Sequence, residues 1–376
     1  MSDVIVKEVT TKRDLKRFID FPIKLNAGVP YYVPPLFMEE YETLRTDKNP
    51  AFEYCDSKMY LAYKDGKIVG RICGLHNKRY NEVWKCSKLR FTRFDFIDDY
   101  EVSAALMAKV EEYAKELELS QIHGPIGFCD LDKQGMLVEG FDEINMFVTP
   151  YNQEYYIKHM EKLGYAKDID WIEFLISLPK QLDERIGRVA DIALRRNKLK
   201  VMKMEKIKEV LPIANKIFDL IYEGYKDLYG VIPLTEKQID MYIKQFISFL
   251  TAEYISVILN QEDEPVAVGI LMPTVIYAMQ KNKGHLFPFG FIPLLKAMKS
   301  KTVERVEFLL IATKPEYQNK GINGVIINEV FSSLQKKKVR YAETGPMLET
   351  NDKIQSMWNH FENRQHKRRR CYVKTL

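Results

Sequence analysis

The 376-residue sequence lacks the cysteine and histidine patterns that mark metal-binding or disulfide-bonded proteins. None of its six histidines lies at metal-ligand spacing from another histidine or a cysteine, so we expect no metal. The cysteines are few, odd in number and scattered without a CxxC pair: Cys55, Cys73, Cys86, Cys129 and Cys371. This usage is typical of a reduced compartment and predicts a cytoplasmic protein.

Long apolar runs and one-sided charge are also missing. The longest apolar candidate, residues 285–298, contains Pro288, Pro293 and Lys296, and residues 1–20 lack the apolar core of a signal peptide. Apart from five Lys and Arg in residues 364–370, basic and acidic residues are equal in number. We therefore expect neither membrane nor nucleic acid as a partner. The basic run itself is predicted to be a solvated loop, with contact to cofactor or RNA phosphates as the alternative.

The most informative stretch runs from Glu304 to Gly345. An uninterrupted apolar run predicts a strand over Val306–Thr313, which Pro315 ends, and an amphipathic helix and a second strand, 339–344, follow. Backbone amides ahead of that helix have no helical partners, and the helix dipole adds positive charge there. The pattern predicts a phosphate or pyrophosphate site, although neither a Walker A loop nor a GxGxxG fingerprint is present.

The loop sequence resembles the acyl-CoA loop Q/R-x-x-G-x-G/A of the GNAT superfamily of N-acyltransferases. Five of six positions match, Asn323 replaces the final small residue, and Gly324 follows one place later. The resemblance implies acetyl-CoA or another acyl-CoA as donor, with pantetheine along Ile311, Ala312 and Thr313. It also implies a wider set of cofactor-binding residues: Gln318, Asn319, Lys320, Gly321, Ile322, Asn323, Gly324 and Asn351.

The sequence also has the pattern of an internal duplication. Gly70 and Gly269, in similar hairpins, are as far apart as Asn152 and Asn351, and the predicted order of strands and helices repeats. We predict an α/β (α+β) protein of two tandem GNAT-like domains, each a mixed, mostly antiparallel twisted sheet flanked by helices. The expected bounds are 1–178, a helical connector 179–197, and 198–376. The chain is similar to uncharacterised bacterial tandem GNAT proteins in its segments Val33–Leu36, Val69–Ile72, Tyr155–Tyr156 and Leu163–Tyr165.

The two halves differ where the acyl-CoA loop should be. Residues 95–101 of the first half contain four carboxylates and no glycine, which would repel a pyrophosphate. We therefore expect the first half to have lost the cofactor site and to wall off the substrate.

By resemblance, the second half transfers an acyl group from acyl-CoA to an unknown primary amine, from a small molecule or a peptide. Glu307 on the central strand is the first candidate for the general base and Glu343 on the next strand is the second. Trp358 stands where GNAT enzymes often have a tyrosine acid, which leaves Tyr341, Tyr317 or Tyr372 as substitutes. The insertion 272–300 is predicted to cover a strand edge, with an acceptor pocket or lid as the alternative. Two other functions stay open: a Fem-like transferase that uses aminoacyl-tRNA, and a non-catalytic acyl-CoA-binding protein.

Overall fold

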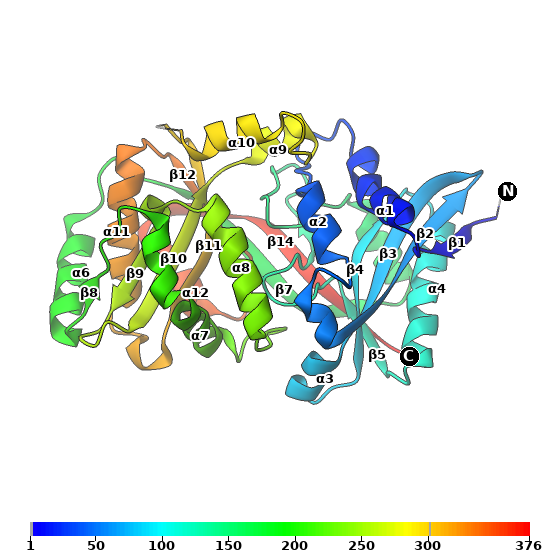
Figure 1. The fold of residues 1–376 in the computed structure, drawn as a ribbon, viewed down its shortest axis with the longest axis horizontal. Coiled ribbons are helices and arrows are strands. Elements are labelled where there is room, and N and C mark those ends of the chain that lie inside the picture. The colour runs from blue at the N-terminus through cyan, green and yellow to red at the C-terminus, as the bar shows by residue number, and fades with distance from the viewer. Residues whose placement is uncertain (1–2, 301) are drawn as a thin grey trace. The chain divides into compact units, whose positions relative to one another are not determined.

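The computed structural model describes residues 3–300 and 302–376, which form two compact units (Figure 1). Unit 1 contains the chain up to Ile172 together with Ile276–Ile292 and His366–Leu376. Unit 2 contains Glu173–Val275 and Pro293–Gln365.

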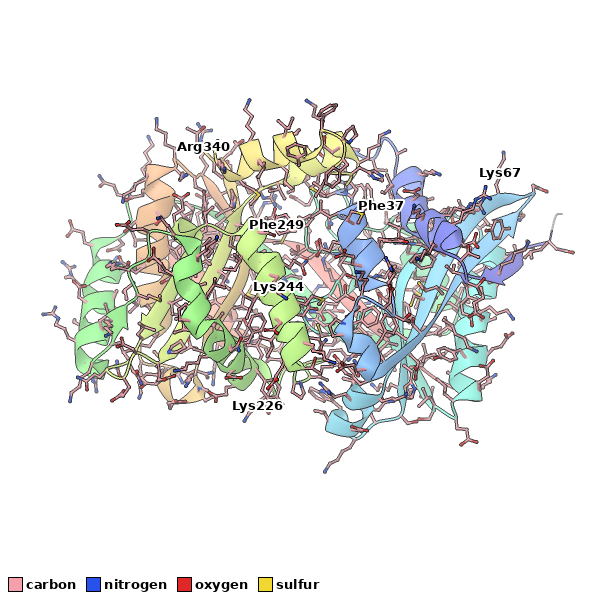
Figure 2. All side chains as sticks on the ribbon, viewed as in Figure 1. Phe37, Lys67, Lys226, Lys244, Phe249 and Arg340 are labelled. Carbon is pink, nitrogen blue, oxygen red and sulfur yellow. The ribbon has the colours of Figure 1, made fainter. Side chains whose placement is uncertain are left out.

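Unit 1 is built on a mixed sheet with the strand order β1-β2-β3-β4-β5-β14, in which only the β4–β5 pair is parallel. Its hairpin β2–β3 turns at Asp65 and Gly66, which both have positive φ, just before Lys67 (Figure 2). The strands are β1 Ile5–Glu8, β2 Cys55–Lys64, β3 Lys67–Asn77, β4 Lys88–Phe96, β5 Gln121–Gly124, β6 Met136–Glu139 and the C-terminal part of β14 Glu362–Thr375. The helices are α1 Lys12–Leu25, α2 Phe37–Thr43, α3 Lys78–Trp84, α4 Tyr100–Glu116, α5 Tyr155–Lys162 and α9 Ile276–Asn282.

Unit 2 repeats this plan with the order β7-β12-β11-β10-β9-β8, in which only the β11–β12 pair is parallel. Its strands are the end of β7 Ala166–Ser177, then β8 Lys200–Val201, β9 Ile255–Leu259, β10 Pro265–Pro273, β11 Arg305–Thr313, β12 Tyr341–Thr344 and β13 Met347–Leu348. Its helices are α6 Glu184–Asn197, α7 Ala214–Tyr225, α8 Glu236–Phe249, α11 Ile322–Lys336 and α12 Asp352–Gln355, and α10 Phe291–Met298 lies within the insertion 272–300. Thr235 and Gln238 form a capping box at the start of α8.

The equivalent glycines explain how the sheet and helix pack in both units. A Cβ atom on Gly70 would lie 2.7 Å from Cδ1 of Leu106 on α4, and one on Gly269 would lie 2.4 Å from Cγ2 of Ile326 on α11. Real Cβ atoms do not approach other atoms so closely, so glycine is what lets each helix rest on its sheet. The two helices therefore occupy the same place in the two copies of the fold.

The end of each half of the sequence forms a strand in the unit that is built mainly from the other half. Tyr372–Thr375 of β14 pair with β5 in unit 1, and Leu175–Ser177 of β7 pair with β12 in unit 2. The predicted domain bounds at 178 and 198 divide the chain into consecutive stretches. The compact units of the structure are not consecutive, because residues 276–292 and 366–376 belong to unit 1.

The basic run 364–370 is not a solvated loop, so that prediction is wrong. It lies within β14, and Lys367 and Arg369 are fully buried. Arg369 donates to Oδ1 of Asn145 at 2.7 Å and to Oγ1 of Thr149 at 3.0 Å. The prediction of a solvated loop failed because a buried guanidinium group needs several hydrogen-bond acceptors. The acceptors of Arg369 come from residues 200 positions or more away in the chain.

Candidate active site

The candidate site of unit 2 begins where its two parallel strands part. β11 and β12 are paired from Arg305 and Tyr341 to Phe308 and Thr344, and β11 then continues to Thr313 without β12. The register with β10 shifts by one residue at this point, which leaves Leu309 as the extra residue of a β-bulge. Bulges are common beside active sites because they redirect the strand.

The loop after β11 exposes backbone donors. Asn319 and Gly321 have left-handed φ angles of 59° and 79°, and Asn319, Lys320 and Gly321 are exposed. No side chain caps α11, which begins at Ile322. In the described part of the chain, the backbone N–H groups of residues 319–323 have no hydrogen-bond acceptor. The turn is therefore open to solvent and offers the features of an anion site.

Side chains of the predicted cofactor residues also brace this turn. Thr313 Oγ1 donates to Oδ1 of Asn323 at 3.0 Å, and Gln318 Nε2 donates to the carbonyl of Thr313 at 3.4 Å. Lys320 Nζ lies 5.2 Å from the ring centroid of Tyr317. Asn351, by contrast, uses its side-chain oxygen to cap α12 by accepting from the N–H of Ile354.

The equivalent position in unit 1 is closed by the protein itself. The carboxylate of Asp99 caps α4, accepting from the N–H of Glu101 at 3.0 Å and from Lys64 Nζ at 2.7 Å. The backbone of Phe96 at the end of β4 is bonded to two tyrosine hydroxyls, with its N–H donating to Tyr156 Oη at 3.0 Å and its carbonyl accepting from Tyr155. A carboxylate thus occupies the helix N-terminus where an anion would bind.

The two candidate bases lie side by side. Glu307 and Glu343 are partners in the register of β11 and β12, and both side chains are fully buried. Glu343 forms an ion pair with Arg305, whereas Oε1 of Glu307 accepts from Thr274 Oγ1 at 3.1 Å. Glu307 lies one residue before the strands part, a position that suits a general base. Glu343 also pairs with Arg305 and therefore has a structural role.

The candidate acids are scattered. Tyr341 is exposed at the opposite end of β12 from the point where the strands part, and Tyr372 is buried in unit 1. Trp358 is buried against Phe308, and its Nε1 donates to the sulfur of Met347. Tyr317 lies in the turn that follows β11.

Sequence reasoning missed Tyr225, at the end of α7. Its hydroxyl donates to the carbonyl of Ile311 at 2.6 Å, on the strand segment predicted to bind pantetheine. The neighbouring Gly224 permits this approach, because a Cβ atom there would lie 3.3 Å from the carbonyl oxygen of Thr313. A glycine near the end of a helical sequence pattern is the one local signal for this contact.

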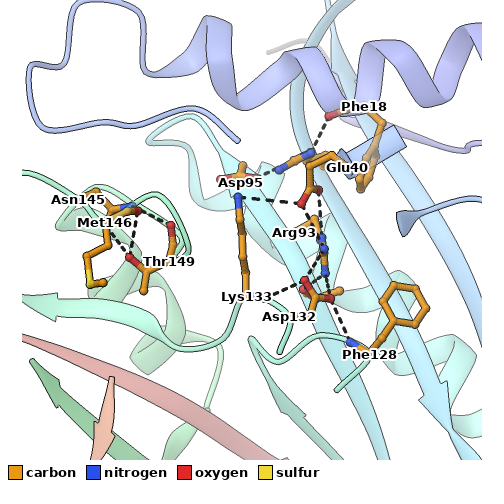
Figure 3. Close-up of polar contacts among 12 residues, drawn as sticks. Phe18, Glu40, Arg93, Asp95, Phe128, Asp132, Lys133, Asn145, Met146 and Thr149 are labelled. Carbon is orange, nitrogen blue, oxygen red and sulfur yellow. Dashed lines mark hydrogen bonds and ion pairs between the residues drawn. The ribbon is translucent and has the colours of Figure 1, made fainter. Parts of the chain in front are cut away.

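Unit 1 contains a separate cleft of about 660 Å³, counted out to the solvent at its mouth. Figure 3 shows the charged cluster at the cleft, where Arg93 binds Asp132 through two 2.7 Å bonds and Glu40 through two 3.3 Å bonds. Burial alone would raise the pKa of Glu40, but Arg93, Lys133 and Arg71 lower it to about 2. Tyr32 also lines the cleft, and among residues 3–300 and 302–376 its buried hydroxyl has no hydrogen-bond partner.

One group in unit 1 has the atoms of a metal site but surroundings that oppose one. Ligand atoms of His123, Asp168 and Cys371 lie within 4.8 Å of one another. Burial first, then the charges of Arg90 and Lys88, lower the pKa of His123. Lys88 also lies 3.3 Å from the Asp168 carboxylate. Positive charges that disfavour an imidazolium repel a metal cation equally.

Comparison with known proteins agrees with this architecture. No protein-family model matches the chain. It is 29% identical over 381 aligned residues to Protein YghO of Escherichia coli, covering 99% of this chain and 95% of that protein. It is 28% identical over 330 residues to the bacterial ceramide synthase of Caulobacter vibrioides, covering 84% and 82%.

Among solved structures, a tandem GNAT protein from the clavulanic acid biosynthesis pathway superposes with a TM-score of 0.58 at 10% identity. That match covers 99% of this chain and 98% of the other. The chain therefore has the tandem GNAT fold, and the predicted fold class is confirmed. Within residues 3–300 and 302–376, no helix is long and apolar enough to cross a membrane.

Proposed function

We propose that the protein is an N-acyltransferase that moves an acyl group from acyl-CoA, bound in unit 2, to a primary amine. One contrast carries the proposal. The helix N-terminus of unit 2 is uncapped and exposed at Gly321, whereas the equivalent N-terminus of unit 1 is capped by Asp99. Because an uncapped N-terminus stabilises an anion, only unit 2 suits a cofactor diphosphate.

The residues around the turn fit acyl-CoA in this proposal. The N–H groups of 319–323 would hold the diphosphate, with Lys320 as a nearby positive charge. The pantetheine arm would follow β11 from Leu309 to Thr313. Since the carbonyl of Ile311 is bonded to Tyr225, the arm displaces that hydroxyl or lies against it.

The chemistry is acyl transfer from sulfur to nitrogen. The lone pair of a neutral amine attacks the thioester carbonyl, a C–N bond forms, and the C–S bond breaks. Glu307 accepts the proton that the nitrogen loses, and the CoA thiolate takes a proton from Tyr225 or from water. Tyr225 joins the earlier candidate acids because its hydroxyl lies on the strand segment assigned to pantetheine.

A long-chain amino alcohol is the first acceptor to test. A ceramide is an amide of such an amine with a fatty acid, so the similarity to a bacterial ceramide synthase supports the same reaction class. The Fem-like alternative is less well supported, because Lys367 and Arg369 are buried within β14 and Arg368 and Arg370 pair with Asp170, which leaves Arg364 as the exposed basic residue of the run. Acyl-CoA binding without turnover of any amine would favour the non-catalytic alternative.

Replacing Gly321 by Glu tests the donor site. At an effective dielectric constant of ~20, an added carboxylate about 5 Å from a diphosphate charge costs ~3 kcal/mol, or on the order of 100-fold in affinity. Gly164→Glu is the matched control, because Gly164 is also exposed and has the same φ of 79° but follows α5 in unit 1. Calorimetric titration with acyl-CoA should show weak or no binding for Gly321→Glu and normal binding for Gly164→Glu. Equal affinity of both variants would refute the site.

A further inference from the structure

The segment Ile276–Ile292 of unit 1 displays an unusual apolar surface. Phe287, Phe289 and Tyr277 are 78%, 71% and 70% exposed, which makes them the most exposed large apolar side chains in the described part of the chain. Ile292 is exposed as well. Grouped apolar side chains of this size mark an interaction site, whereas single exposed ones do not. We call residues 276–292 the aromatic segment.

The charge of the aromatic segment has one sign. Its sequence contains no Asp or Glu. Both of its lysines, Lys281 and Lys283, are exposed. Aromatic rings interspersed with lysines, without acids, are the composition of surfaces that bind at the interface of anionic membranes.

The aromatic rings are presented on a segment that is firmly fixed within unit 1. Nε2 of Gln280 donates to the carbonyls of Pro30 and Tyr32 at 2.8 and 3.0 Å. The N–H of Phe37, labelled in Figure 2, donates to the carbonyl of Gly284 at 2.9 Å, and its ring stacks on His285 at 4.8 Å. These contacts hold the segment in one position, so the rings are not exposed through local disorder. Their exposure therefore indicates a binding partner.

We propose that the aromatic segment binds the surface of an anionic phospholipid bilayer. Phe287 and Phe289 insert at the level of the headgroups, and the lysines pair with lipid phosphates. A second copy of the chain is a poorer partner, because a symmetric contact through this face would set lysines against lysines with no carboxylate between them. The prediction of no membrane partner was based on the lack of an apolar run long enough to span a membrane. Binding at the bilayer surface does not require such a run.

The inference stands apart from the proposed reaction, although a membrane is also where a long-chain amine would be met. The 30–37 segment that anchors Gln280 and Gly284 lines the unit 1 cleft through Tyr32, Val33 and Pro35. A lipid bound at the aromatic segment would thus lie next to residues that form this cleft.

The test is co-sedimentation of the full chain with vesicles of phosphatidylcholine alone or with about 30 mol% phosphatidylglycerol. We expect binding only to the anionic vesicles, weakened in about 0.5 M salt because screening shortens the reach of the lysines. Replacing Phe287 and Phe289 by Ser should lower the partition coefficient at least about tenfold, since both rings leave the interface. Replacing Lys281 and Lys283 by Gln should lower it roughly fivefold for each lysine.

Matched variants control for general surface effects. Ile5→Ser with Val83→Ser removes two exposed apolar side chains elsewhere in unit 1, and Lys115→Gln with Lys158→Gln removes two exposed lysines. Both pairs should bind as the unaltered chain does.

The outcomes are decisive in either direction. Absent binding to anionic vesicles, or binding that Phe287→Ser with Phe289→Ser leaves unchanged, overturns the proposal. Self-association that this double variant abolishes, without vesicle binding, assigns the face to a second copy and also overturns it. Gly321→Glu should bind vesicles normally, so failure of the donor site and failure of the membrane surface are distinguishable.

Discussion

Replacing Glu307 by Gln separates the two candidate bases. Glu307 and Glu343 are neighbours across β11 and β12, equally buried, and differ in what holds them. Thr274 donates to Glu307, and a glutamine carbonyl can accept the same hydrogen bond. Glu343 instead neutralises Arg305, so its replacement removes half of an ion pair.

These contacts give different expected magnitudes. Glu307→Gln removes the proton acceptor and should lower kcat by ~10²–10⁴, with little change in Tm or in affinity for acyl-CoA. Glu343→Gln leaves the mostly buried guanidinium of Arg305 unneutralised, which costs ~3 kcal/mol or more. For a unit of roughly 150–250 residues, the size of unit 2, such a loss lowers Tm by roughly 6–12 °C. Its effect on kcat should be the smaller of the two.

The assay follows release of the CoA thiol with a panel of amines that includes a long-chain amino alcohol. Thermal unfolding and calorimetric titration with acyl-CoA accompany each variant, so that a fold defect is not mistaken for a chemical one. An unchanged kcat for Glu307→Gln would refute its role as base. A loss of kcat confined to Glu343→Gln, with normal Tm, would transfer that role to Glu343.

Two further predictions concern the fold. Gly269→Ala should destabilise the protein by ~1–3 kcal/mol in chemical unfolding, because its Cβ would clash with Ile326, whereas Gly324→Ala has open space and should stabilise α11 by up to ~1 kcal/mol. Equal effects of the two alanines would contradict this packing. Burial raises the pKa of Asp130 to about 6, so its folded form favours the proton, and the stability it contributes below its ordinary pKa is lost as pH rises toward 6. Asp130→Asn should therefore raise the free energy of unfolding by ~1–3 kcal/mol at pH ~8 and by little near pH ~4, and a gain confined to low pH would contradict it.

Local patterns predicted most of the elements because their signals are local. The buried strand that Pro315 ends forms where expected, and the helix that follows it does too. The exchange of end strands between the two halves of the sequence could not be predicted from it, because it depends on pairing between distant segments. The basic run failed for the same reason, since its acceptors come from other parts of unit 1.

The sequence predicted one feature of the candidate site and missed others. The open turn at 319–323 follows from a glycine-bearing loop before a helix, and the structure has it. The pairing of Glu343 with Arg305 and the approach of Tyr225 to Ile311 are tertiary contacts without a local signal. The roles assigned to Glu307, Glu343 and Tyr341 stay predictions.

The duplication itself provides the argument for where chemistry remains. Both central strands carry a one-residue register shift before their helix, at Arg93 in β4 and at Leu309 in β11. In unit 1 the shifted residue is an arginine tied to Glu40 and Asp132, and the helix start is filled by Asp99. In unit 2 the equivalent bulge residue is the apolar Leu309, and no described side chain caps the start of α11. This difference in whether protein charges fill the anion position is the reason we propose the donor site in unit 2, and the charged cleft of unit 1 would suit a different ligand.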